Sequence, residues 1–150
     1  MNLKELSKKE VKEILEKLSD YYGIDISFLR EISKKFCWLS NKEGKIYITN
    51  KSVKKYIKNF LPHRVGLYIA KKEKNYIRLS IEGSQLLGVK ATKNILNLNS
   101  DIVLSTEIVD NQELDRGYYI LRSQNDYLGC GFSKNNKLKI MISKNRRISK

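Results

Sequence analysis

The spacing of apolar residues changes near residue 88, and this change limits the possible folds more than any other feature of the sequence. Up to Gly88, helical and strand-like segments alternate in the order α-α-β-β-α-β-β-α. Beyond it, most segments read as short strands separated by turns. We therefore predict an α+β protein, with an N-terminal α/β unit at residues 1–90 and a small mixed β-barrel at residues 91–150.

Residues 7–23 give the clearest local prediction, a helix. Ser7 and Glu10 have the spacing of a capping box, in which each side chain accepts a hydrogen bond from the backbone of the other residue. Apolar residues then recur at helical spacing, and Gly23 stands where a left-handed residue ends many helices.

The other elements of the first unit are shorter. A second helix is capped by Asp25 or Ser27, and a hairpin is predicted at residues 36–49. A third helix begins after Asn50 and ends before the single proline, with lysines on one face. Two strands joined by a Lys-Lys-Glu-Lys turn and a short helix that stops at Gly88 complete the unit.

Four strand-like stretches follow, with turns at Ser123–Asp126 and at the Asn135-Asn136 pair. Gly129 and Gly131 lie two apart in one of them, where they allow a close backbone approach or a bend. The stretches are residues 92–99, 117–123, 127–132 and 137–143.

The chain is strongly basic, with 30 Lys and Arg against 16 Asp and Glu, a formal net charge of +14. Such an excess favours a polyanionic partner, although solubility alone is the alternative explanation. The charge is also unevenly distributed, because an acidic segment at residues 79–116 separates a basic segment at 51–78 from a basic tail after Asp126. Two basic blocks indicate patches on the surface.

The sequence has few histidine and cysteine residues that could take part in catalysis or bind a metal ion. The single histidine, His63, follows the proline, and Cys37 and Cys130 lie far apart without a Cys-x-x-Cys pattern. We find no nucleotide-binding, nucleophile or metal motif, so we predict a binding protein with no enzymatic activity and no cofactor or metal. No stretch is apolar enough to span a membrane, and the N-terminus is too charged for a signal peptide, so we expect a cytoplasmic location.

The strongest candidate binding site is the basic C-terminal segment. Lys137 and Lys139 are two apart and so share one face of a strand, whereas Leu138, Ile140 and Ile142 occupy the other. The predicted nucleic-acid-binding residues are Lys134, Lys137, Lys139, Lys144, Arg146 and Arg147. A secondary basic face on the third helix is either an extension of this surface or an ordinary solvated face, and it comprises Lys51, Lys54, Lys55 and Lys58.

Residues 117–148, "GYYILRSQNDYLGCGFSKNNKLKIMISKNRRI", resemble the end of PUA domains and of the PUA-like domains of Sun/Fmu-type RNA cytosine methyltransferases. The resemblance implies that the predicted barrel is PUA-like and that its basic tail binds RNA. The chain lacks the length and the Pro-linked cysteine of the methyltransferase domain. Residues 99–116 also lack the glycine-bearing loop and short helix that usually join the first two strands of PUA domains.

The first half, "ILEKLSDYYGIDISFLRE" followed by "FCWLSNKEGKIYITNKSVKKYI", is similar to the Nip-seven family of large-subunit ribosome biogenesis factors. The resemblance implies an RNA-binding protein in ribosome biogenesis or in rRNA or tRNA modification. We expect it to be a monomer. The alternative is a protein-interaction adaptor in a ribosome-assembly or RNA-processing complex. In that case the acidic stretch Asp101–Asp115 would contact a basic partner.

Overall fold

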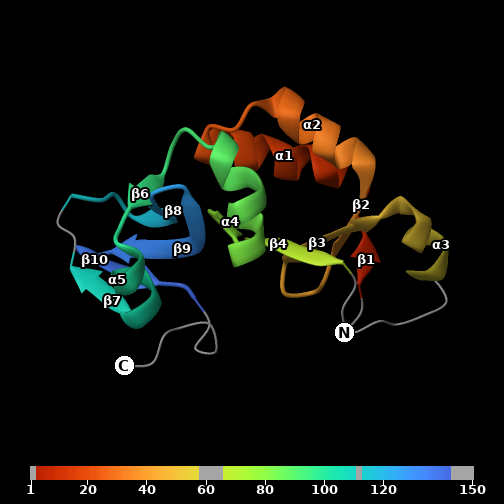
Figure 1. Ribbon diagram of the computed structural model, residues 1–150. Coiled ribbons are helices and arrows are strands. Elements are labelled where there is room, and N and C mark those ends of the chain that lie inside the picture. The colour runs from red at the N-terminus through yellow and green to blue at the C-terminus, as the bar shows by residue number, and fades with distance from the viewer. Residues whose placement is uncertain (1–2, 58–65, 111–112, 143–150) are drawn as a thin grey trace.

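The computed structural model describes residues 3–57, 66–110 and 113–142 (Figure 1). Two five-stranded sheets lie at the two ends of the molecule, and helices cover the first sheet and separate it from the second. The fold is therefore mixed α+β, as predicted.

Two helices cover one face of the first sheet, at the top of Figure 1. Helix α1 spans Lys8–Tyr22, and both hydrogen bonds of the predicted capping box between Ser7 and Glu10 are present. Gly23 ends the helix in the left-handed conformation, at φ 64°. Helix α2 spans Ile26–Lys35, and Asp25 is its N-cap. The local sequence prediction for this helix pair is confirmed.

The first sheet is antiparallel, in the order β1-β2-β3-β4-β5. After β3, Asn50 caps a short 3-10 helix, η1 (Lys51–Val53), which continues into α3 (Lys54–Ile57). Tyr56 on α3 is 51% exposed. The strands are β1 (Lys4–Glu5), β2 (Phe36–Ser40), β3 (Lys45–Asn50), β4 (Leu67–Lys72) and β5 (Ile77–Leu79).

Helix α4 (Ile81–Leu87) lies between the two sheets, with Ser80 as its N-cap (Figure 1). As predicted, the helix stops at Gly88, which is its C-cap and continues in a right-handed conformation into the 3-10 helix η2 (Gly88–Lys90). A Cβ atom at this position would lie 2.4 Å from the Tyr127 ring. Gly88 therefore permits close packing against that ring.

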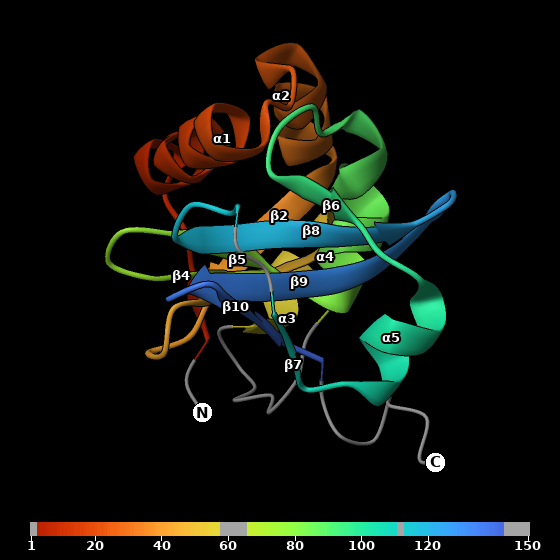
Figure 2. The same ribbon diagram turned by 90° about the vertical axis from the view of Figure 1, so that its left-hand side faces the viewer.

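The second sheet has the order β6-β8-β9-β10-β7, with β6 parallel to β8 and the other pairs antiparallel (Figure 2). Both Asn135 and Asn136 have positive φ, as a two-residue hairpin turn requires. The strands are β6 (Ile95–Asn97), β7 (Ile108–Asp110), β8 (Gly117–Ser123), β9 (Asp126–Lys134) and β10 (Lys137–Ile140).

Two expectations for this half need correction. Among the described residues the sheet is open, because β6 and β7 form its two edges and do not pair with each other, so the closed barrel is not observed. The segment between β6 and β7, for which we predicted no helix, contains α5 (Ser100–Ser105), capped by Asn99. A single buried side chain, Val103, anchors this short helix in a second apolar cluster.

The main apolar core is continuous across both halves of the molecule. Leu18 and Tyr22 of α1 belong to the same cluster as Ile120 of β8 and Cys130 of β9. The hydroxyl group of Tyr21 donates a hydrogen bond to the carbonyl oxygen of Tyr118 (3.0 Å) and accepts one from its N–H (2.8 Å). The two sheets thus share one core. The division at residue 90 stays a prediction.

Candidate nucleic-acid interface

The hairpin formed by β9 and β10 brings three of the predicted lysines together. Lys134 and Lys137 are directly opposed Cα partners, and Lys139 lies two residues further along β10. All three are exposed. On the other face of β10, Leu138 and Ile140 are fully buried, as the alternating sequence predicted.

Aromatic rings continue the same face of the second sheet. Opposed residues in an antiparallel pair share a face, and Phe132 is opposed to both Lys139 and Tyr118. The Phe132 ring lies 4.8 Å from that of Tyr118 and 5.7 Å from that of Tyr76 on the adjoining half. We call this surface the basic sheet face, formed by Lys134, Lys137, Lys139, Phe132 and Tyr118.

Two arginines border the basic sheet face, and sequence reasoning did not assign either of them to the site. The Arg116 guanidinium lies 5.9 Å from the centre of the Phe132 ring, and the Arg78 guanidinium lies 6.0 Å from that of Tyr118. Arg116 ends the acidic segment and Arg78 lies in the other half of the chain. The two arginines and Lys139 belong to one surface only because β5 and β8 contact each other in the fold.

Acidic groups limit the positive charge of this surface at two places. Asp110 on β7 is the Cα partner of Lys137 on the side away from Lys134. The Glu73 carboxylate accepts hydrogen bonds from the Tyr118 hydroxyl at 2.8 and 3.0 Å. Burial, assisted by this carboxylate, raises the pKa of Tyr118, so its phenol stays neutral and acts as a donor.

The secondary basic face is separate from this surface, because Figure 1 shows α3 and β10 at opposite ends of the molecule. Lys54 forms a 2.9 Å ion pair with Glu5, and the Lys55 ammonium lies 4.9 Å from the centre of the Tyr56 ring. Lys51 is exposed at the start of η1. These lysines do not extend the basic sheet face.

Several predicted residues lie outside the described part of the chain. They are Lys58 of the secondary face, Lys144, Arg146 and Arg147 of the C-terminal cluster, and His63.

The two cysteines occupy core positions. Cys37 and Cys130 are free and buried, and burial raises the pKa of both thiols, that of Cys130 to about 12. Among the described residues, no three His, Cys, Asp or Glu side chains gather in an arrangement that could hold a metal ion. None of the helices in these ranges combines the length and apolar character that crossing a membrane requires.

Comparison with known protein families gives one match. Residues 3–81 match the family model of the NIP7/UPF0113 pre-PUA domain, which is more than half of the chain. This range covers the first sheet with the helix pair and ends at the start of α4. No curated protein matches the chain. The resemblance of residues 117–148 to Sun/Fmu-type methyltransferase domains stays a prediction.

Proposed function

Because the chain belongs to the NIP7/UPF0113 family of ribosome biogenesis proteins, we propose that it is a non-catalytic RNA-binding protein that acts in that process or in rRNA or tRNA modification. Family membership supports the role in ribosome biogenesis. RNA binding is our inference from the basic sheet face. We further propose that residues 1–90 and 91–150 are two domains that pack closely through the shared core and that the second is PUA-like.

The opposition of Lys134 and Lys137 is the observation that carries the proposal. Like charges directly opposite each other destabilise an antiparallel pair, and Asp110 offsets only one side of Lys137. A bound phosphate between the two ammonium groups relieves that repulsion. Lys139 extends the positive strip along the strand, as a phosphate backbone requires.

The adjacent rings fit RNA better than a rigid duplex. Phe132 is partly exposed beside Lys139, where an unstacked base of an RNA loop or bulge can contact its ring. Tyr118 is only 5% exposed and packs against the Phe132 ring. Arg116 and Arg78 add cations at the border of this aromatic cluster. We expect phosphate contacts to supply most of the affinity.

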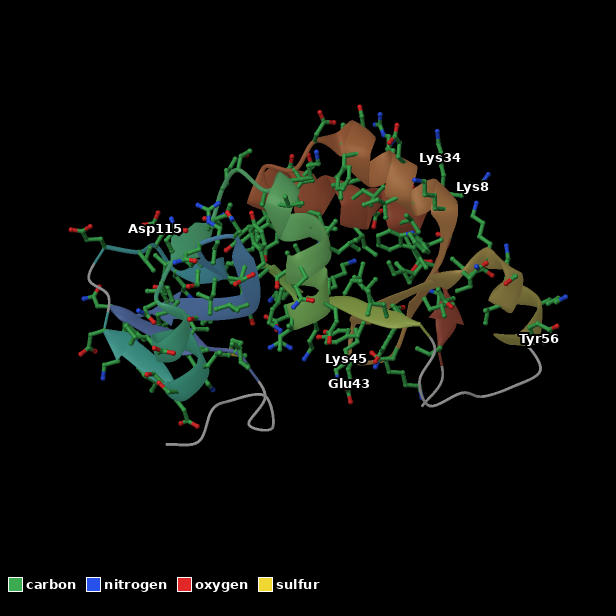
Figure 3. The ribbon with its side chains drawn as sticks, viewed as in Figure 1. Lys8, Lys34, Glu43, Lys45, Tyr56 and Asp115 are labelled. Atoms are coloured by element: carbon green, nitrogen blue, oxygen red, sulfur yellow. The ribbon has the colours of Figure 1, made fainter. Side chains whose placement is uncertain are left out.

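A protein-interaction adaptor is the second candidate function. The acidic side chains between residues 101 and 115 are exposed, and Asp115 lies at the far end of the second half (Figure 3). Such a surface suits a basic partner within a ribosome-assembly or RNA-processing complex.

The test is fluorescence anisotropy with a labelled structured RNA and with duplex DNA of equal charge, each across a salt series. A preference for RNA that persists at high salt supports the proposal. Equal and steeply salt-dependent binding of both ligands contradicts it and indicates a generic polyanion surface.

Matched variants locate the site. In K134Q/K137Q/K139Q, the loss of three phosphate contacts makes the slope of log affinity against log salt about 2 less steep. The control K9Q/K35Q/K42Q removes the same charge from exposed lysines elsewhere. Equal loss of affinity in the two variants would exclude the basic sheet face as the binding site.

A further inference from the structure

A groove of about 640 Å³ opens between α1, α2, β2 and the start of α3, at the end of the molecule away from the second sheet. Its volume is typical of ligand-binding pockets. Apolar side chains form much of its lining: Leu6, Val11, Leu15, Ile26, Phe36 and Trp38.

Six cations and two carboxylates also line the groove. Two of the cations are paired, Lys54 with Glu5 at 2.9 Å and Lys12 with Glu16 at 4.0 Å. The other four are exposed and form no ion pair within the described ranges: Lys8, Arg30, Lys34 and Lys51. The groove therefore combines an apolar surface with uncompensated positive charge.

The helix pair explains why these cations gather. Lys8 lies at the start of α1 and Lys34 lies near the end of α2, and the turn between the helices brings these two ends together. Figure 3 shows both side chains extending outward on the same side of the molecule. Arg30 is one helical turn before Lys34 and faces the same way.

We propose that this groove binds an acidic amphipathic peptide segment of a partner protein. Apolar side chains of the segment enter the groove, as in helix-in-groove recognition, while its carboxylates contact the unpaired cations around it. The inference is independent of RNA binding, because the groove and the basic sheet face lie at opposite ends of the molecule.

The aromatic side chains of the groove favour a peptide over RNA. Single-stranded RNA needs exposed ring faces on which its bases stack, but Trp38 is only 4% exposed and Phe36 is partly buried. Most of the remaining apolar lining is aliphatic. Such a surface suits apolar side chains better than stacked bases.

Trp38 also provides the readout. It is the only tryptophan of the chain, it lines the groove, and its buried indole N–H has no acceptor among the described residues. The probe is a synthetic peptide with leucine at helical positions i, i+3, i+4 and i+7 and glutamate at the others. We expect saturable changes in Trp38 emission with this peptide, and none with a scrambled peptide of the same composition.

The groove variant K8E/R30E reverses two unpaired cations, and we expect it to weaken the peptide about tenfold. Glutamate suits both positions, since an acidic residue is favourable in the first turn of α1 and forms helix well in α2. The control K9E/K35E makes the same charge change on the same helices, at exposed residues that do not line the groove. It should retain the affinity, and circular dichroism verifies that both variants fold.

Three results would overturn the proposal. The first is equal weakening of the peptide by the groove variant and its control. The second is a Trp38 response to oligouridine RNA and none to the acidic peptide. The third is a Trp38 signal that depends on protein concentration alone, which would assign the groove to a second copy of the chain.

Discussion

Replacing Tyr21 by phenylalanine removes one oxygen atom, and that atom connects the two halves of the molecule. The hydroxyl group donates to the Tyr118 carbonyl oxygen and accepts from the Tyr118 N–H. On this edge of β8, pairing with the β6 segment begins only at Ile120, whose N–H donates a hydrogen bond to the carbonyl oxygen of Asn94. The Tyr21 hydroxyl thus satisfies the backbone of β8 just before its partner strand begins.

The magnitude follows from the two hydrogen bonds. Each contributes about 1 kcal/mol net, and leaving a partly buried backbone group without a partner adds to the cost. We expect Tyr21→Phe to lower the free energy of unfolding by about 2–3 kcal/mol. The ring remains, so its edge-to-face contacts with Tyr22 and Tyr76 are kept.

Urea titration followed by circular dichroism and by Trp38 fluorescence measures this loss. Tyr56→Phe is the matched control, because Tyr56 is 51% exposed, and its effect should stay within about 0.5 kcal/mol. A Tyr21→Phe effect equal to that of the control would refute the reasoning. Two separate transitions in the wild-type protein would show that the shared core does not couple the halves.

Two further predictions concern packing and titration. Gly88→Ala should destabilise the protein by about 1–2 kcal/mol, because the new methyl group would lie 2.4 Å from the Tyr127 ring. This cost exceeds the gain from the better helix propensity of alanine. An unchanged thermal midpoint of unfolding would contradict the prediction. Burial raises the pKa of Tyr21 and of Cys130 to about 12, so both hold their protons in the folded protein at pH values where the unfolded chain loses them. Stability should therefore fall as the pH rises from about 9 to 12, and a urea midpoint that stays constant over this range would exclude the effect.

Features governed by neighbouring residues were predictable from the sequence. The capping box of α1, the caps at Asp25 and Asn50 and the turn at Asn135-Asn136 depend on backbone groups only a few residues away. The alternation along β10 assigned its lysines to the exposed face for the same reason.

Features that depend on distant packing were not predictable. Helix α5 has six residues and one buried anchor, so its local pattern was too weak to distinguish it from a loop. The helix stop at Gly88 was predicted, but the sequence does not reveal that the Tyr127 ring lies against this residue.

By itself, the sequence determined the main elements, the alternation of its strands and the positive charge of two segments, because these depend on residue type and spacing. Only the tertiary structure decided which charges act together. It placed Arg78 and Arg116 beside the aromatic rings of the second sheet, and it separated Lys54 from Lys139 by the length of the molecule. It also formed the groove around Trp38, because a concave surface exists only where elements from different parts of the chain meet.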